Sequence, residues 1–110
     1  MEHSQMKALF IVINAGHVDE VMEVARAAGV QGATILNARG EGALHEVFMG
    51  ITVDSEKEML LCIVDEETSI RVMAAIKGKA GIKSPAHSIC FTLPVDKIVG
   101  INADMSEAAD

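Results

Sequence analysis

The chain has 110 residues, of which half are hydrophobic and 3% are aromatic, and its formal net charge at pH 7 is -7. This length predicts a single domain over residues 1–110, because domains of about 100 to 150 residues are the most common. With nine Lys and Arg residues, the chain is a poor candidate for binding nucleic acid, whose phosphates are contacted mainly by these side chains. So apolar a small chain is also expected to bury part of its surface between subunits.

No segment reaches the run of about 18 to 20 apolar residues that spans a membrane, and residues 1–7 are too polar for a signal peptide. We therefore expect a cytoplasmic protein without membrane insertion. Cys62 and Cys90 each lie in an apolar run, and neither has a Cys or His at metal-ligand spacing. This pattern indicates two buried, reduced thiols.

The first half of the chain predicts a strand, a helix and a second strand. Residues 7–14 (KALFIVIN) are almost continuously apolar and rich in β-branched side chains, which is typical of a central strand. Apolar residues then recur at helical spacing over residues 18–28, and Gly29 is expected to end this helix. Residues 33–39 (ATILNAR) predict the second strand, and a loop begins at the glycine pair of residues 40–42.

The middle of the chain predicts a hairpin. Residues 47–53 (VFMGITV) have the composition of a strand, residues 54–58 (DSEKE) that of a polar turn, and residues 59–64 (MLLCIV) that of an antiparallel partner. The acidic residues 65–67 are expected to cap a second helix, which the pattern continues to Gly78.

The last long strand is predicted at residues 87–93 (HSICFTL), after the turn-forming stretch 81–86, and residues 103–110 are expected to be a frayed tail. The resulting order is β-α-β-β-α-β with a glycine-bearing excursion after the second strand. This order predicts an α+β, ferredoxin-like fold in which two helices cover one face of an antiparallel sheet.

No group of residues in the sequence indicates catalysis or metal binding. The four histidines lie in four different predicted elements, with no pair at ligand spacing; they are His3, His17, His45 and His87. The acidic clusters at residues 56–58 and 65–67 are interpreted as solvated charge in a turn and at a helix cap. There is no nucleophile elbow and no phosphate-binding GxxxxGK(S/T) loop. We therefore expect a binding protein, with no catalytic residue and no metal ligand.

Three stretches together resemble the PII family of trimeric nitrogen-regulatory signalling proteins and their PII-like relatives. The first is Met6-Lys7 with the later Asp19-Glu20-Val21, and the second is GVQGAT at residues 29–34. The third is the late strand that runs into Phe91, Leu93, Pro94 and Val95. The similarity extends over residues 6–101.

The resemblance implies a homotrimer that binds a small effector, an adenine nucleotide such as ATP or ADP, in the clefts between subunits. It also implies a flexible loop after the second strand that contacts a protein target, such as a transporter or a metabolic enzyme. The ligand-binding residues that it implies are Thr34, Arg39, Gly40, Gly42, Lys79, Lys83 and Ser88. The loop, about residues 40–46, would present Glu41, His45 and Glu46 to the target.

The chain departs from the family pattern in the parts that hold phosphate. It has KAGIKSPAHS at residues 79–88 in place of a GDGK-like turn, and KIVGI at residues 97–101 lacks two arginines of the family. Lys79 and Lys83 could replace these donors in part. An acidic chain binds an anion only where its cations converge, which here requires Arg39 and Lys97 beside the two lysines.

The target loop is several residues short, and without tyrosine the tyrosine modification of the family's bacterial members is impossible. Diverged relatives of this kind bind other small ligands, including nucleotides and bicarbonate.

Three other hypotheses remain open at this point. A CutA-like trimer has a related fold and is associated with divalent metals, but the sequence has no clustered His or Cys. A small dimeric αβ-barrel enzyme would need an acid or base in a pocket lined by the sheet. A purely structural interaction subunit would need only the apolar surface.

Overall fold

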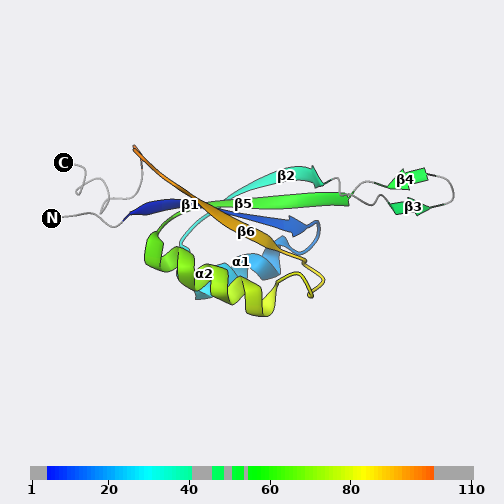
Figure 1. Ribbon diagram of the computed structural model, residues 1–110, viewed down its shortest axis with the longest axis horizontal. Helices are drawn as coiled ribbons and strands as arrows, with labels where there is room; N and C mark the ends of the chain where they lie inside the picture. The colour runs from blue at the N-terminus through cyan, green and yellow to red at the C-terminus, as the bar shows by residue number, and fades with distance from the viewer. Residues whose placement is uncertain (1–4, 41–45, 49–50, 54, 101–110) are drawn as a thin grey trace.

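The computed structural model describes residues 5–40, 46–48, 51–53 and 55–100, with the backbone alone for residues 46–48, 51–53 and 55. Figure 1 shows the elements in chain order. They are β1 (Met6–Asn14), α1 (Val18–Ala27), β2 (Thr34–Gly40), β3 (Glu46–Phe48), β4 (Ile51–Val53), β5 (Ser55–Asp65), α2 (Glu66–Lys79) and β6 (Ile89–Pro94). The predicted tail at residues 103–110 lies outside the described residues.

Four strands form an antiparallel sheet in the order β2-β5-β1-β6. Both helices lie on the same face of this sheet (Figure 1). Each helix joins two strands that are not neighbours in the sheet: α1 connects β1 to β2 with β5 between them, and α2 connects β5 to β6 with β1 between them. This is the split βαβ arrangement, and it confirms the predicted ferredoxin-like α+β fold.

The predicted hairpin of residues 47–53 with residues 59–64 is wrong. The polar residues 55–58 are the first residues of β5, which pairs directly with β2, so that Arg39 lies opposite Glu56 and Ala38 opposite Lys57. Residues 51–53 pair instead with residues 46–48, as the two-stranded sheet of β3 and β4. Polar side chains are compatible with a strand here because Lys57 and Glu58 hydrogen-bond to residues 14 and 16 at the end of β1.

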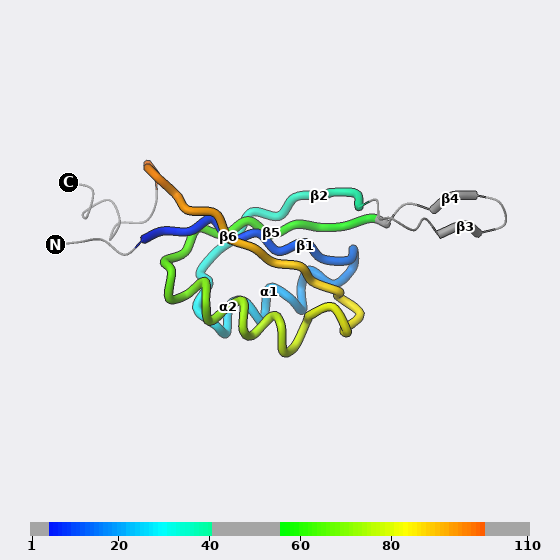
Figure 2. Tube along the Cα trace, in the orientation of Figure 1, coloured from blue at the N-terminus to red at the C-terminus, as the bar shows by residue number. Residues whose placement is uncertain are grey.

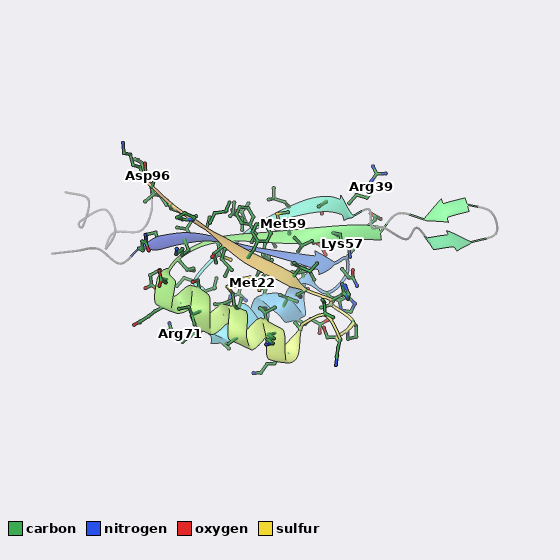
Figure 3. All side chains as sticks on the ribbon, in the orientation of Figure 1. Met22, Arg39, Lys57, Met59, Arg71 and Asp96 are labelled. Carbon is green, nitrogen blue, oxygen red and sulfur yellow. The ribbon has the colours of Figure 1, made fainter. Side chains whose placement is uncertain are left out.

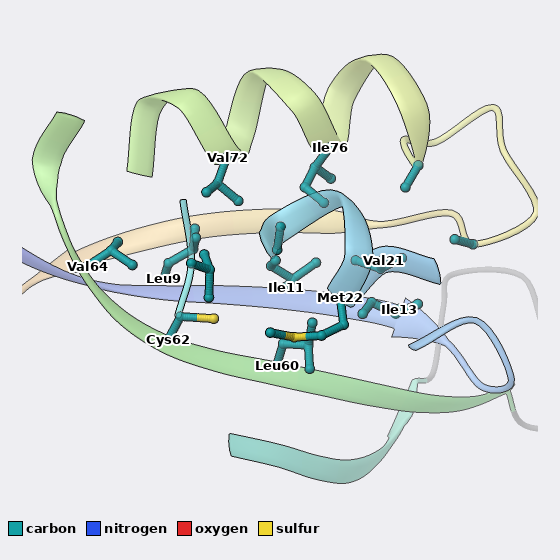
Figure 4. Close-up of a cluster of buried hydrophobic side chains, with 14 residues drawn as sticks. Leu9, Ile11, Ile13, Val21, Met22, Leu60, Cys62, Val64, Val72 and Ile76 are labelled. Carbon is teal, nitrogen blue, oxygen red and sulfur yellow. The ribbon is translucent and has the colours of Figure 1, made fainter. Parts of the chain in front are cut away.

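The hydrophobic core lies between the helices and one face of the sheet (Figure 4). Alternate residues of β1 and β5 point into it, as the period of two in a strand requires. The fully or nearly fully buried side chains from the strands are Leu9, Ile11, Ile13, Leu60, Cys62 and Val64, and those from the helices include Val21, Met22, Ala25, Val72 and Ile76.

Cys62 is buried in this core and Cys90 is half-buried, and both are free cysteines. Burial raises the pKa of both thiols above the ordinary value. A raised pKa lowers the fraction of reactive thiolate at neutral pH. Cys62 is thus buried as predicted, whereas Cys90 is less enclosed than the sequence indicates.

The opposite face of the sheet is also apolar, and neither helix covers it. The register places Ala8, Phe10 and Val12 of β1 on this face, together with alternate residues of the other strands. Those residues are Leu36 of β2, Met59, Leu61 and Ile63 of β5, and Ile89, Phe91 and Leu93 of β6. The Phe10 and Phe91 rings stack with their centroids 5.0 Å apart. We call this surface the open face.

The helix ends follow local rules. Gly29, with φ of +122°, follows the end of α1, and the left-handed conformation there favours glycine. Asp65 caps α2, because its Oδ1 accepts a hydrogen bond of 2.7 Å from the Thr68 backbone N–H. Its side-chain and backbone hydrogen bonds with Thr68 lower the pKa of the Asp65 carboxyl. The acidic residues 65–67 therefore cap the helix as predicted.

Two boundaries differ from the predicted ones. Helix α2 continues through Gly78 to Lys79. Strand β6 begins at Ile89 and not at residue 87, because the Ser88 N–H donates to the Ala80 carbonyl and His87 has a positive φ of 48°. The chain therefore leaves α2 through a tight loop before it joins the sheet.

Replacing Ile11 by Ala is expected to lower the free energy of unfolding by about 2–5 kcal/mol, since it opens a cavity in the core. Ile70→Ala is the matched control, because this side chain is 60% exposed on α2, and its effect should stay within about 0.5 kcal/mol. Urea unfolding of both variants at one protein concentration measures the difference. Equal losses would contradict the assignment of the core.

Replacing Asp65 by Ala is expected to cost about 1 kcal/mol at pH 7, because the cap of α2 is lost. Since the pKa of Asp65 is lowered by folding, its contribution is present above the ordinary value of 3.8 and is lost as the pH falls through the folded pKa. The stability difference between the native chain and the variant should therefore shrink below about pH 4 in urea titrations. Asp65→Asn keeps the capping oxygen and should remove most of this pH dependence; an unchanged pH dependence would contradict the cap.

Candidate functional site

Three segments meet at one end of the sheet. They are the end of β2 with the start of β5, the turn at residues 14–16 after β1, and the loop at residues 80–88 between α2 and β6. Figure 4 shows the end of β1 beside the loop that follows α2. Because β1 and β2 both run toward this end while β5 starts from it, one end of the sheet collects all three. We call it the loop end.

An open depression of about 510 Å³ lies along the last residues of β2 and the first of β5. It is lined by Asn37, Ala38, Arg39 and Glu56. Arg39 and Glu56 are opposite each other in the ladder, and both are exposed. A cation and a carboxylate thus line this depression, beside the segment that joins β2 to β5.

The turn at residues 14–16 is fastened to β5 by three hydrogen bonds. The Lys57 Nζ donates to the Asn14 Oδ1 at 2.6 Å, and the Gly16 N–H donates to the Glu58 Oε1 at 3.1 Å. The Ala15 N–H donates to the Glu56 carbonyl, also at 3.1 Å. Residues 56–58 of the predicted polar turn thus fix the corner of the sheet.

The same turn is fastened to the 80–88 loop. The Asn14 N–H donates to the Ala86 carbonyl at 2.9 Å, and the Asn14 Nδ2 donates to the Pro85 carbonyl at 3.0 Å. Asn14 therefore contacts both sides of the loop end. It connects the base of the β2–β5 segment to the loop that the resemblance assigns to phosphate.

The 80–88 loop uses much of its own backbone to hold its shape. The N–H groups of Ser84, His87 and Ser88 donate to carbonyls of residues 81, 84 and 80. The His87 Nδ1 lies 2.9 Å from the Ile82 carbonyl, and since a carbonyl only accepts, this nitrogen carries the proton. These amides are therefore already satisfied, unlike those of a loop whose free N–H groups cradle phosphate.

Arg39 and Gly40 lie at the loop end, at the last positions of β2. Lys79 is the last residue of α2, and Lys83 is exposed on the 80–88 loop. Ser88 is only 6% exposed, and its hydroxyl has no hydrogen-bond partner within the part of the chain that the structure describes. Five of the seven predicted ligand-binding residues therefore lie in or directly beside the segments of the loop end, in a sheet whose two edge strands are β2 and β6.

The other predicted residues lie elsewhere or outside the described chain. Thr34 begins β2 opposite Leu61, and five residues of strand separate it from Arg39 by about 16 Å. Gly42, and with it Glu41 and His45 of the predicted target loop, lie outside the described residues. Glu46 is the first residue of β3, where only the backbone is described.

Lys97 does not join the other cations within one chain. Strand β6 runs from Ile89 opposite Val12 to Pro94 opposite Lys7, away from the loop end. Figure 3 shows Asp96 at the opposite end of the sheet from Arg39 and Lys57. In Figure 2 the described chain also ends there, near the start of β1. The four cations therefore do not converge in a single chain.

Sequence reasoning missed Asn14 and Lys57 as members of the site. From the sequence, Asn14 is only the last residue of a predicted strand, and Lys57 is part of a predicted polar turn. The available signal was the alternation of side chains along a strand. If it continues from Met59 back to Lys57, these two side chains lie on the same face of the sheet, the face that also carries Asn14. A strand starting at residue 55 would place Lys57 in the sheet, but its position opposite Asn14 is set by the register with β1.

Among the described residues, no three His, Cys, Asp or Glu side chains are grouped so as to hold a metal ion. No helix in the described ranges is long and apolar enough to cross a membrane. The fold and the loop end define a ferredoxin-like α+β protein with a candidate ligand site between a strand end and a loop.

Comparison with known proteins identifies the family. A family model described as Nitrogen regulatory protein P-II matches residues 6–105. The chain therefore belongs to the nitrogen regulatory protein P-II family, a family of regulatory, signal-transducing proteins. A comparison with curated proteins finds no match.

Three solved structures have the same fold. A PII-like signaling protein from Thermus thermophilus is 23% identical with a TM-score of 0.65, over 86% of this chain and 91% of that one. The B. subtilis GlnK–ATP complex is 18% identical with a TM-score of 0.63, over 84% and 85%. CPII, a nitrogen regulatory PII-like protein from Thiomonas intermedia bound to ADP, AMP and bicarbonate, is 19% identical with a TM-score of 0.65, over 88% and 97%.

Proposed function

We propose that the chain is a PII-like regulatory protein that senses an adenine nucleotide at the clefts of a homotrimer. It passes the state of that site to a protein target, such as a transporter or a metabolic enzyme, through the segment that follows β2. It acts by binding and not by catalysis. Of the four hypotheses raised by the sequence, membership of the P-II family favours this one.

The observation that carries the proposal is the joining of two segments at the loop end. The resemblance assigns one wall of the nucleotide cleft to the base of the loop after β2 and the other to residues 79–88. Hydrogen bonds through Asn14 and Lys57 hold these two segments together in one chain. The GlnK complex with ATP and the CPII complex with ADP, AMP and bicarbonate support an adenine nucleotide as the ligand.

The open face supports the trimer. Ile89, Phe91 and Leu93 of β6 are 52%, 43% and 51% exposed in the single chain, and they continue an apolar surface across the whole sheet. Apolar surface of this extent is typical of a protein–protein interface. We assign it to other copies of the same chain, because burial between identical subunits also explains the high apolar content of so small a chain.

A second subunit would also complete the set of cations. Arg39, Lys79 and Lys83 belong to the loop end, whereas Lys97 lies toward the opposite end of its own chain. In a trimer, Lys97 of a neighbouring subunit could face this end. Because several loop amides are occupied within the 80–88 loop, these side chains would carry most of the contact with phosphate.

Binding of ATP, ADP or AMP is expected to raise the melting temperature of the native protein in a thermal-shift assay. Lys83→Ala should reduce that shift, because it removes an exposed cation from the 80–88 loop. Arg26→Ala is the control: it removes one exposed positive charge from the last turn of α1 and should leave the shift unchanged.

Bicarbonate and divalent metals belong in the same screen. If no nucleotide raises the melting temperature, nucleotide sensing is contradicted, and partner binding alone remains as the function. A shift with a divalent metal alone would favour the CutA-like alternative.

Replacing Phe91 by Asp is expected to convert the trimer to monomers, because a carboxylate would be buried against the apolar open face of a neighbour. Light scattering coupled to size-exclusion chromatography measures the mass, and circular dichroism checks that the sheet persists. Ile70→Asp places the same charge on the exposed side of α2 and should leave the mass unchanged. A native chain that is monomeric at micromolar concentration would contradict the assignment of the open face.

A further inference from the structure

We infer that Asn14 is a positioning residue that couples the base of the β2–β5 segment to the 80–88 loop. A change that moves Lys57 is transmitted through the Asn14 side chain to the loop, before any ligand is bound. This inference rests on the proposed function and deepens it, since it names the residue through which a movement of one wall of the proposed cleft displaces the other.

The chemistry of the two contacts fixes the orientation of the Asn14 amide. The Lys57 ammonium has donors only, so it requires the Asn14 oxygen; the Pro85 carbonyl accepts only, so it requires the Asn14 nitrogen. The distances are 2.6 Å to Lys57 and 3.0 Å to Pro85. A rotation of the amide that breaks one contact therefore also breaks the other, which is what a mechanical coupling needs.

The Lys57 side chain also lies against the end of β2. Gly40, the last residue of β2, packs against it so closely that a Cβ on Gly40 would lie 2.9 Å from the Lys57 Cε and 3.3 Å from its Cγ. A Cβ at this position would therefore displace the Lys57 side chain. Displacement of the β2 end therefore reaches Asn14 through the side chain of Lys57.

The contacts of the Asn14 side chain can be removed without removing the backbone hydrogen bond that attaches the 80–88 loop to β1. The Asn14 backbone N–H donates to the Ala86 carbonyl at 2.9 Å, and this bond does not depend on the side chain. Variants of the Asn14 side chain thus keep the loop fastened to β1. The side chain adds a direct contact between the loop and Lys57 of β5, beside the backbone path through β1.

The test is hydrogen exchange of the ligand-free protein, followed at the loop amides that are hydrogen-bonded within the loop, those of Ser84, His87 and Ser88. Lys57→Met should speed their exchange by about 2- to 10-fold, the range that corresponds to the loss of one hydrogen bond. Core amides of β1 report any change in global stability. Lys7→Met makes the same substitution at the opposite end of the sheet, near Glu66, and should leave loop exchange unchanged.

Two Asn14 variants make the test specific. Asn14→Asp keeps an oxygen for Lys57 but turns a carboxylate oxygen toward the Pro85 carbonyl, so loop exchange should rise although Lys57 keeps its partner. In Asn14→Ala the loop should already exchange fast, and adding Lys57→Met should have no further effect. Gly40→Ala should act like a weaker Lys57→Met.

Either of two results would overturn the inference. If Lys57→Met leaves the loop amides unchanged, no signal passes through Asn14. If the effects of Lys57→Met and Asn14→Ala add, the two residues act on the loop separately. Neither result depends on nucleotide binding, so failure of the coupling and failure of the proposed ligand are distinguished.

Discussion

The direct antiparallel pairing of β5 with both β1 and β2 is the constraint on which the rest of the structure depends. One strand sets two registers at once: Leu60 lies opposite Ile11 on one side and Ile35 on the other. A slip of one residue would turn the core residues of β5 toward the open face. The same pairing carries residues 56–58 to the turn after β1, so the core and the loop end are fixed by one set of hydrogen bonds.

The fold could be predicted from the sequence because its elements are marked by local chemistry. An almost continuous apolar run rich in β-branched residues marks β1, helical spacing and Gly29 mark α1, and Asp65 marks the start of α2. The start of β5 could not be predicted in this way, since DSEKE has the composition of a turn. Its strand conformation depends on partners distant in the sequence, Arg39 and Asn14, which a local pattern does not contain.

For the candidate site, the sequence singles out residues only where the family resemblance extends. Arg39, Gly40, Lys79, Lys83 and Ser88 lie in the segments of the loop end, but Asn14 and Lys57, which join those segments, have no motif. The role of each is defined by its partner and not by its own type. For Ser88 the resemblance names the residue but not its environment. No pattern in the sequence indicates that its hydroxyl is buried without a partner among the described residues.

Strand β2 is an edge strand that contributes residues to two surfaces. Its alternate residues Thr34, Leu36 and Ala38 lie on the open face, and its last residues form the depression beside Glu56. In the proposed trimer, subunit association and ligand binding would therefore order the same seven-residue strand. The two equilibria would then be linked: ligand would lower the protein concentration at which subunits assemble, and dilution would weaken the apparent affinity for ligand. The abundance of the protein in its surroundings would become an input to the signal alongside the ligand itself.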